Sequence, residues 1–381
     1  MASDRTIIRD PVHGTIELTA LERTILDSAP LQRLRHVRQL GMAHLVYPGA
    51  HHTRFEHSLG CLHLADRMAA AIRLGEDDLV RLRLAALLHD VGHLAFSHDS
   101  ESVTRERLGD HEARGARMVR SGELADLIGR VENPATIARW LQGSSYGQLL
   151  ASDVGADRID YLLRDAHYTG VAYGVVDAAR ILSTLRWKDN APALRGGGLE
   201  AAESLIMARF EMFHAVYYHH TVRIIRSMLQ AALLEGLADP SIDWKAAQSD
   251  GDRDLLERIS EQPAARKWVQ RLTARNLHKR ALMVPIGTLD KKQQKAAQDG
   301  RMASELSQIC GCEVLVSAPD PFKSQTTIAI LMEEGALPLE EASPLVASLQ
   351  EAAAGRAQLL VAAPKGQAKR VEKAARKWLG A

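Results

Sequence analysis

A histidine and an aspartate, His89 and Asp90, stand side by side at the end of an apolar run that closes with Leu87-Leu88. Such a doublet at the end of an apolar helix indicates two metal ligands, because imidazole nitrogen and carboxylate oxygen together suit a borderline or hard divalent ion. His93 and His98 follow within nine positions. Four such groups in ten residues at a buried helix end predict a fold that closes around a metal ion.

Composition limits the class of protein. A length of 381 residues allows one large or two medium domains. The net charge of +1, from 48 basic and 47 acidic residues, argues against a protein whose main role is to coat nucleic acid or an anionic membrane. A hydrophobic content of 46% with only 4% aromatic residues reflects many alanines and leucines, so we expect a mainly helical chain.

The expected cellular location of the protein follows from its few cysteines and from the lack of membrane-helix and signal-peptide patterns. Three cysteines, Cys61, Cys310 and Cys312, do not form a disulfide framework, and we expect reduced thiols. No apolar run has the length of a membrane helix, and no signal-peptide pattern opens the chain. We therefore expect a soluble cytoplasmic protein with no membrane partner. The basic tail 365–377 is interpreted as a solvated helix face rather than a nucleic-acid patch.

The patterning predicts a helical core between two smaller parts. Residues 5–18 alternate around Pro11 and Gly14 and predict a hairpin. Helical periodicity covers much of residues 19–168, a second hairpin is expected within 185–199, and one long amphipathic helix over 201–236. Beyond residue 240 we expect helices mixed with strands near 281–288, 312–333 and 356–362, and a closing helix over 366–379. The predicted domains are a core over 1–240 and an α+β lobe over 241–381 that serves as an oligomer or packing surface.

Two outlying residues complete a candidate ligand set. His57 lies upstream in Arg54-Phe-Glu-His57, and Asp157 lies downstream in Asp157-Arg-Ile-Asp160. A lone histidine or aspartate is weak evidence for a metal site. The order His57, His89-Asp90, Asp157, however, resembles the HD superfamily of metal-dependent phosphohydrolases. The resemblance implies a mainly α fold, with an HD-type helical metal-binding core over residues 1–240, beside the small hairpin and the α+β lobe.

Further motifs resemble the deoxynucleoside triphosphate (dNTP) triphosphohydrolase branch of this superfamily, which includes the vertebrate SAM-and-HD-domain enzymes and bacterial relatives. The match covers residues 5–235 clearly. The motifs are Asp10-Pro-Val-His13-Gly14, Leu31-Gln32-Arg33-Leu34-Arg35, Gln39-Leu-Gly41, Pro48-Gly49-Ala, Arg54-Phe-Glu-His57-Ser-Leu-Gly60, His89-Asp90-x-Gly92-His93-x-x-Phe96-Ser97-His98, His111-Glu112, Asp157-Arg158-x-Asp160-Tyr161-x-x-Arg164-Asp165 and Met212-Phe-x-x-Val-Tyr217-x-His219.

The resemblance implies metal-dependent hydrolysis of dNTPs to deoxynucleoside and tripolyphosphate, and it assigns roles to residues. The implied metal ligands are His57, His89, Asp90 and Asp157, and the ion could be Mn, Fe, Mg, Ni or Zn. The implied catalytic groups are His93, His98, His111 and Glu112, with His98 as the general acid. The implied substrate-binding residues are Gln39, Arg54, Arg158, Tyr161, Asp165 and Tyr217, of which Tyr217 would exclude a 2′-hydroxyl.

The resemblance also implies a regulatory site. Asp27, Gln32 and Arg35 match positions at which relatives bind a guanine nucleotide, and an acid with an arginine suits the edges of guanine. Thr6 and Arg9 depart from the phosphate-binding residues of the vertebrate enzymes. The implied partners are a GTP or dGTP activator and further copies of the chain, as a dimer or tetramer.

Alternatives stay open at this point. An HD-type phosphodiesterase, nucleotidase or nuclease would use the same metal ligands, and a nucleotide-sensing module would bind without turnover. Without the resemblance, Tyr217 and His219 on their apolar helix would be interpreted as core residues. Arg54 would be paired with Glu56, and Asp165 with Arg164.

Overall fold

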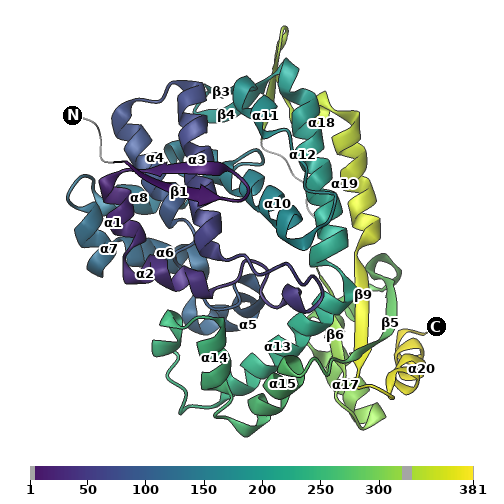
Figure 1. Cartoon of the computed structure of the whole chain (residues 1–381). Helices are drawn as coiled ribbons and strands as arrows, with labels where there is room; N and C mark the ends of the chain where they lie inside the picture. Colours follow the sequence, from purple (N-terminus) through teal and green to yellow (C-terminus); the bar gives the residue numbers. More distant parts are fainter. Residues whose placement is uncertain (1–4, 320–327, 381) are drawn as a thin grey trace. The chain divides into compact units, whose positions relative to one another are not determined.

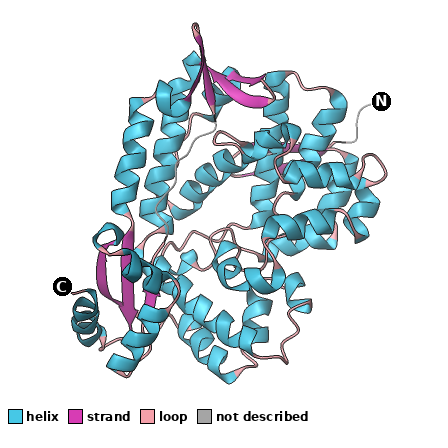
Figure 2. Cartoon of the chain, turned by 180° about the vertical axis from the view of Figure 1, so that it is seen from behind, coloured by secondary structure: helices cyan, strands magenta, loops and turns pink. Residues whose placement is uncertain are grey.

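The computed structural model describes residues 5–319 and 328–380, and within them the chain is mainly α with a few short strands (Figure 2). This confirms the predicted fold class. Part of the strand region expected near 312–333 falls on residues 320–327 and lies outside the described residues. None of the helices described has both the length and the apolar character needed to cross a membrane.

The chain divides into two compact units. Unit 1 comprises Met1–Glu211, Asp243–Leu255 and Thr326–Val346, and unit 2 comprises Met212–Ile242, Leu256–Gln325 and Ala347–Ala381. The division differs from the predicted boundary at residue 240 because long-range pairing decides it. Strand β7 (Ala329–Met332) pairs in parallel with β4 (Ala191–Arg195), whereas helix α13 (His220–Ala238) packs against α15 (Pro263–Thr273).

Unit 1 opens with the predicted hairpin, β1 (Thr6–Asp10) and β2 (Gly14–Leu18), which lies beside helix α3 (Figure 1). Its other helices are α1 (Ala20–Leu26), α2 (Ala29–Arg33), α3 (Arg54–Ile72), α4 (Glu76–Leu88), α5 (His98–Leu108), α6 (His111–Val119), α7 (Gly122–Ile128), α8 (Pro134–Leu141), α9 (Gln148–Ala151), α10 (Ala156–Thr169), α11 (Ala178–Thr184), α12 (Leu199–Met212) and α18 (Leu339–Ala342). The second predicted hairpin, β3 (Leu185–Lys188) with β4, is extended by β7 and β8 (Gly335–Pro338).

The core of unit 1 lies where α3 packs against α4 and α10, and α4 against α8. Leucines and alanines fill it: Leu84 to Leu88 on α4 and Leu59, Leu62 and Ala65 on α3 are at most 3% exposed. The small residues allow close helix packing, and their burial supplies the hydrophobic stabilisation. Polar groups at the ends of these helices are therefore held at fixed positions.

Unit 2 contains the predicted α+β lobe. Strands β5 (Lys279–Pro285), β9 (Gln358–Ala363) and β6 (Leu315–Ser317) form an antiparallel sheet in the order β5-β9-β6. Helices α16 (Lys291–Gln298), α17 (Arg301–Cys310) and α20 (Ala368–Leu379) pack on it, and Leu306, Val361 and Val371 belong to their shared core (Figure 1). Helices α14 (Asp252–Ile259) and α19 (Pro344–Arg356) contribute residues to both units.

The single long helix predicted over 201–236 is wrong. Helix α12 ends at Met212, a π-helical turn covers Phe213–Tyr217, and α13 begins at His220. The backbone N–H of Tyr218 donates to the carbonyl of Phe213, five residues back, which widens the helix by one residue. His219 then leaves the helical conformation, and its ring accepts from the N–H of Thr221 to cap α13.

Candidate metal centre and adjoining histidine cluster

The four predicted metal ligands come from the ends of three helices in unit 1. His57 lies in the first turn of α3, His89 and Asp90 directly follow α4, and Asp157 lies in the first turn of α10. Thr53 precedes α3, and its N–H and hydroxyl both donate to the carboxylate of Glu56, which fixes where the helix begins. Glu56 is therefore a capping residue and not the partner of Arg54.

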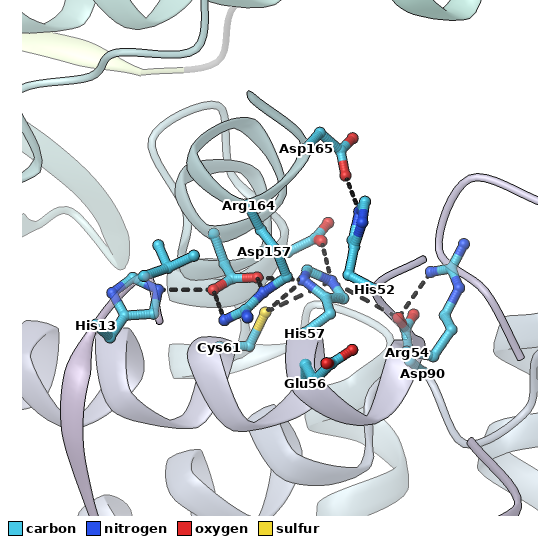
Figure 3. Close-up of polar contacts among 12 residues, drawn as sticks. His13, His52, Arg54, Glu56, His57, Cys61, Asp90, Asp157, Arg164 and Asp165 are labelled. Atoms are coloured by element: carbon cyan, nitrogen blue, oxygen red, sulfur yellow. Dashed lines mark hydrogen bonds and ion pairs between the residues drawn. The ribbon is translucent and has the colours of Figure 1, made fainter. Parts of the chain in front are cut away.

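The ligand atoms converge on one point. His57 Nε2 lies 3.0 Å from Asp157 Oδ1, 3.2 Å from His89 Nε2 and 3.6 Å from Asp90 Oδ2 (Figure 3). His89 Nε2 lies 3.5 Å from Asp90 Oδ1 and 3.9 Å from Asp157 Oδ1. Four groups with these separations match the spacing of donors around a single small ion. The structure thus brings His57, His89 and Asp157 together with the thiol of Cys61 as a group that could hold a metal ion, and it places Asp90 beside His57 and His89.

The tautomers of the two histidines test whether a cation fits. His57 Nδ1 lies 2.7 Å from Asp160 Oδ2, and His89 Nδ1 lies 2.8 Å from the carbonyl oxygen of Ala86. Both partners are acceptors, so each Nδ1 donates to its partner, and each Nε2 is left facing the carboxylates of Asp90 and Asp157. Burial lowers the pKa of His89, but the charge of Asp90 outweighs burial and raises that pKa to about 9, so the space between these nitrogens and carboxylates favours a positive charge, which either protons or a metal ion can supply. The donor set therefore fits a divalent metal.

Asp160, from the Asp157-Arg158-x-Asp160 motif, supports the candidate ligand His57. It is fully buried and accepts from His57. Burial by itself would raise the pKa of its carboxyl group, but the neighbouring guanidinium of Arg164 lowers that pKa well below its usual value. Arg164 thus pairs with Asp160 and not with Asp165. A buried thiol, Cys61, also adjoins the site, with its sulfur 3.6 Å from both ring nitrogens of His57.

Arg54 connects the ligand set to the predicted phosphate-binding groups. Its Nη1 donates to Asp90 Oδ2 at 2.7 Å, and its Nε donates to Ser97 Oγ at 2.8 Å. Only 3% of Arg54 is exposed. The guanidinium is held in one orientation beside the metal ligands, as binding of a phosphate by an arginine fork requires.

Three predicted histidines form a second cluster beside Asp90. The rings of His93 and His111 stack with centroids 4.0 Å apart, and His98 stands edge-on to both. His93 is 1% exposed, and neither of its ring nitrogens has a hydrogen-bond partner among the described residues. Its Nε2 lies 3.3 Å from Asp90 Oδ1, outside hydrogen-bonding geometry. A buried imidazole without partners is costly, so the cluster fits a site that a ligand completes.

Glu101, rather than the predicted Glu112, is the acid of this cluster. Glu101 Oε2 lies 2.9 Å from His111 Nδ1, and its Oε1 accepts from the backbone N–H of His111. Glu112 is exposed, and no hydrogen bond of the described residues joins it to the histidines. The sequence signal was the spacing: His98 and Glu101 are three residues apart and share one face at the start of α5.

A strained turn presents His98. Phe96 and Ser97 have φ angles of 62° and 53°, which non-glycine residues rarely adopt. Three groups hold the turn: Asp252 Oδ1 accepts from the N–H of Phe96 at 2.8 Å, Ser97 Oγ donates to the carbonyl of Arg38, and Arg54 donates to Ser97 Oγ. Desolvation and the positive charge of Arg54 lower the pKa of His98 to about 4. His98 is nevertheless exposed, so a ligand can reach its ring.

The predicted sugar-binding residues lie together. His52 Nε2 is 2.7 Å from Asp165 Oδ1, and its ring stacks on Tyr168. The N–H of Gln39 donates to the carbonyl of His52, and the buried Oε1 of Gln39 has no hydrogen-bond partner among the described residues. A buried amide oxygen without a hydrogen-bond partner is suited to a polar group of a ligand.

Basic and aromatic side chains lie around Tyr161. Arg158 pairs with Asp153, and Arg209 on α12 hydrogen-bonds to Tyr161. Burial, followed by the charge of Arg158, lowers the pKa of Arg209, so two cations lie close together here. The sequence analysis missed Arg209, although an arginine within an apolar helical stretch was an available signal. Tyr217 belongs to unit 2, where its ring contacts Phe213, and its role stays a prediction.

The predicted regulatory residues lie on the surface of unit 1. Asp27 and Arg35 are exposed, and Gln32 is partly buried. Arg35 Nε donates to Gln32 Oε1 at 2.9 Å, Gln32 Nε2 donates to the carbonyl of Leu26, and the guanidinium of Arg35 lies 3.5 Å above the ring of Phe55. These contacts hold the Arg35 side chain in place next to the start of α3.

Comparisons with known proteins agree with this geometry. A family model described as HD domain matches residues 54–165, and one described as HD associated region matches residues 176–381. Uncharacterized protein MJ1154 of Methanocaldococcus jannaschii is 35% identical over 95% of this chain and 80% of its own length. A crystal structure of a hypothetical protein from Aquifex aeolicus superposes with a TM-score of 0.82 at 28% identity, covering 97% of this chain and 99% of that one.

One named relative carries an activity in its name. The deoxynucleoside triphosphate triphosphohydrolase SAMHD1 homolog of Dictyostelium discoideum is 28% identical over 72% of this chain. The matched region spans 59% of that relative, so a large part of it has no counterpart in the alignment.

Removing one ligand tests the metal centre. Asp157→Ala leaves three of the four donors and should weaken Mn²⁺ binding at least about 100-fold, as measured by equilibrium dialysis with elemental analysis. His51→Ala, which removes an exposed histidine from the loop before α3, should bind as the parent does. Unchanged binding by Asp157→Ala would place the ion elsewhere.

Proposed function

Because this chain belongs to the HD-domain phosphohydrolases that carry an HD-associated region, we propose that it hydrolyses dNTPs to deoxynucleoside and tripolyphosphate. The coarser activity, metal-dependent phosphohydrolysis, follows from the family, and the cluster of His57, Cys61, His89 and Asp157, which could hold a metal ion, agrees with it. The observation that carries the finer proposal is the continuity of these ligands with Arg54 and the histidine cluster through Asp90. The name of the Dictyostelium relative supports it.

Substrate binding would use fixed cations and neutral imidazoles. Arg54, held by Ser97 and Asp90, would pair with phosphate oxygens, and Arg158 and Arg209 would balance further phosphate charge. Asp165, oriented by His52, would accept from the 3′-hydroxyl, and the amide group of Gln39 would donate to the oxygen of that hydroxyl. In this proposal Tyr161 and Tyr217 pack on the deoxyribose, and Tyr217 excludes a 2′-hydroxyl.

Proton transfer would fall to His98. A divalent ion held by His57, His89, Asp90 and Asp157 would supply an acidified water and a polarising charge at the α-phosphate. The anionic phosphates would raise the low pKa of His98, and the protonated ring would give its proton to the departing 5′-oxygen. His111, oriented by Glu101, would place a second imidazole beside it. The bond that breaks joins the α-phosphorus to the 5′-oxygen.

Product analysis tests the substrate and the bond cleaved. Incubation with the four dNTPs in Mn²⁺ and in Mg²⁺ should give deoxynucleosides by chromatography and tripolyphosphate by ³¹P NMR, and ribonucleotides should react much more slowly. In H₂¹⁸O the label should enter the tripolyphosphate, since water attacks phosphorus. Asp157→Ala is the inactive control. Pyrophosphate, orthophosphate or a nucleoside monophosphate would instead support an HD-type phosphodiesterase, nucleotidase or nuclease, and no turnover would support a nucleotide sensor.

Two substrates whose leaving groups differ in their need for a proton test the role of His98. His98→Ala should lower kcat for a dNTP about 10²–10⁴-fold, the usual contribution of a general acid. In p-nitrophenyl triphosphate the nitrophenolate replaces the deoxynucleoside as the leaving group on the α-phosphorus and needs no proton, so the same variant should lose far less activity on this substrate. The exposed His167→Ala serves as the control. Equal losses on both substrates would contradict proton donation by His98.

We propose further that Asp27, Gln32 and Arg35 bind a guanine nucleotide that activates the enzyme. The carboxylate of Asp27 could accept from N1 and N2 of guanine, and Arg35, held by Gln32 and Phe55, could donate to O6 and N7. A nucleotide shared between copies of the chain would make the active species a dimer or tetramer. The free state of all three cysteines is compatible with a cytoplasmic enzyme, which we also propose.

One substitution, at Arg35, tests whether GTP or dGTP activates the enzyme through the proposed regulatory site. GTP or dGTP should increase turnover of a second dNTP and shift the mass seen by light scattering. Arg35→Ala should raise the half-activating concentration about tenfold or more, the equivalent of one lost guanine contact. Arg67→Ala, another exposed arginine of unit 1, should respond to GTP as the parent does. A parent enzyme indifferent to both nucleotides would remove the regulatory proposal and leave the catalytic one intact.

A further inference from the structure

The turn of the N-terminal hairpin contacts the carboxylate behind the metal centre. Asp160 Oδ2 lies 2.7 Å from His57 Nδ1, and Asp160 Oδ1 lies 2.7 Å from His13 Nε2. Arg164 donates to both oxygens, from Nε and Nη2, at 2.9 Å. Figure 3 shows His13 and Arg164 on the side of His57 that faces away from Asp90. Asp160 therefore holds a metal ligand with one oxygen and is itself held through the other.

Asp10 fixes the hairpin to the same group. Its Oδ1 accepts from the backbone N–H groups of Val12 and His13, at 2.9 and 2.8 Å, and so shapes the turn that carries His13. Its Oδ2 accepts from Arg164 Nη1 at 2.8 Å. The side chains of Asp10, His13, Asp160 and Arg164 are at most 7% exposed. Because these side chains are buried away from water, each hydrogen bond between them is strong, and the loss of any one partner costs free energy.

Gly60 leaves the space that the network occupies. A Cβ at this position on α3 would lie 1.8 Å from Asp160 Oδ1 and 2.5 Å from Arg164 Nη2. Any other residue would force Asp160 away from His57 and His13. The Asp10-Pro-Val-His13-Gly14 motif, Gly60 and Arg164, to which the proposed function gives no task, thus converge on one carboxylate.

We propose that His13 is a positioning residue of the metal centre, which acts by donating a hydrogen bond to Asp160 and so fixing the orientation and tautomer of His57. Asp160 is paired with Arg164 and can only accept, so His13 must donate from Nε2. The hairpin is then a part of the metal site and not only a cover for α3. The inference rests on metal binding at His57 and is independent of which phosphate ester is the substrate.

The size of the effect follows from comparable sites. Loss of a group that orients a metal-ligating histidine typically costs 10–100-fold in metal affinity. His13 acts through Asp160, which keeps Arg164 as a partner, so we expect about a tenfold loss at the lower end of that range. A residue that only stabilised the hairpin would lower the melting temperature and leave the affinity of the folded protein unchanged.

The experiment titrates the metal-free full chain with Co²⁺, in competition with a chromophoric chelator. His13→Leu removes the donor, whereas His13→Gln places an amide N–H near the position of Nε2. We expect His13→Leu to bind Co²⁺ about tenfold more weakly with an altered visible spectrum, and His13→Gln to restore binding to within about threefold. His63→Leu removes a neighbouring ring that contacts His13 but not Asp160, and should bind as the parent does.

A second substitution, at Gly60 on α3, acts on Asp160 directly and leaves His13 in place. Gly60→Ala should displace Asp160 and weaken Co²⁺ binding at least as much as His13→Leu, because the added Cβ overlaps its oxygen. Gly115→Ala on α6, where the nearest atom is 3.5 Å away, is the matched control. Circular dichroism identifies the variants that keep the fold.

Parent-like Co²⁺ affinity in a folded His13→Leu or Gly60→Ala protein would overturn the proposal. A lower melting temperature at unchanged affinity would do the same, because it would show a purely structural role. The readout needs no nucleotide, so a chain that fails to hydrolyse dNTPs would refute the proposed function without touching this inference.

Discussion

The site depends on two imidazole nitrogens that face each other 3.2 Å apart between two carboxylates. In each ring the other nitrogen is already committed, to Asp160 in His57 and to a main-chain carbonyl in His89. The free nitrogens and the two carboxylates thus surround a position that favours a positive charge, as a divalent ion would supply. The close packing of α3 against α4 and α10 is what forces these groups together, so the apolar core and the metal site support one another.

Asp90 makes the ligand set and the histidine cluster one continuous site. Its carboxylate faces His57 and His89 and also contacts Arg54 and His93. Burial opposes ionisation of Asp90, but Arg54 foremost, followed by the histidines, lowers its pKa well below the usual range. An ionised Asp90 is therefore able to bind a metal and to orient an arginine at once. A phosphate bound to Arg54 would necessarily lie next to the ion.

The sequence predicted what depends on local pattern and on motifs. Periodicity predicted the hairpin within 5–18 and the helix that ends before His89, and the HD order predicted that His57, His89, Asp90 and Asp157 belong to one site, where the structure places them near one another. Glu101, Asp160 and Arg209 were not assigned, because each acts through a partner 10 or more residues away, and only the packing shows which partner that is. The π-helical turn before Tyr218 was not predicted for another reason. A single inserted residue changes the apolar periodicity of the sequence only slightly, so the stretch still resembles one continuous helix.

Residues from the range matched as the HD-associated region also contact the candidate site in unit 1. The two matched ranges therefore do not separate the site from the rest of the chain. Asp252 and Arg209 lie within the matched range 176–381 but belong to unit 1. Asp252 accepts from the N–H of Phe96 and from Arg38, which stabilises the strained turn before His98. Burial raises the pKa of Asp252 to about 6 despite these hydrogen bonds, so holding this carboxylate ionised costs free energy. Asp252 thus stabilises the strained turn that presents His98, the residue that we propose as the general acid.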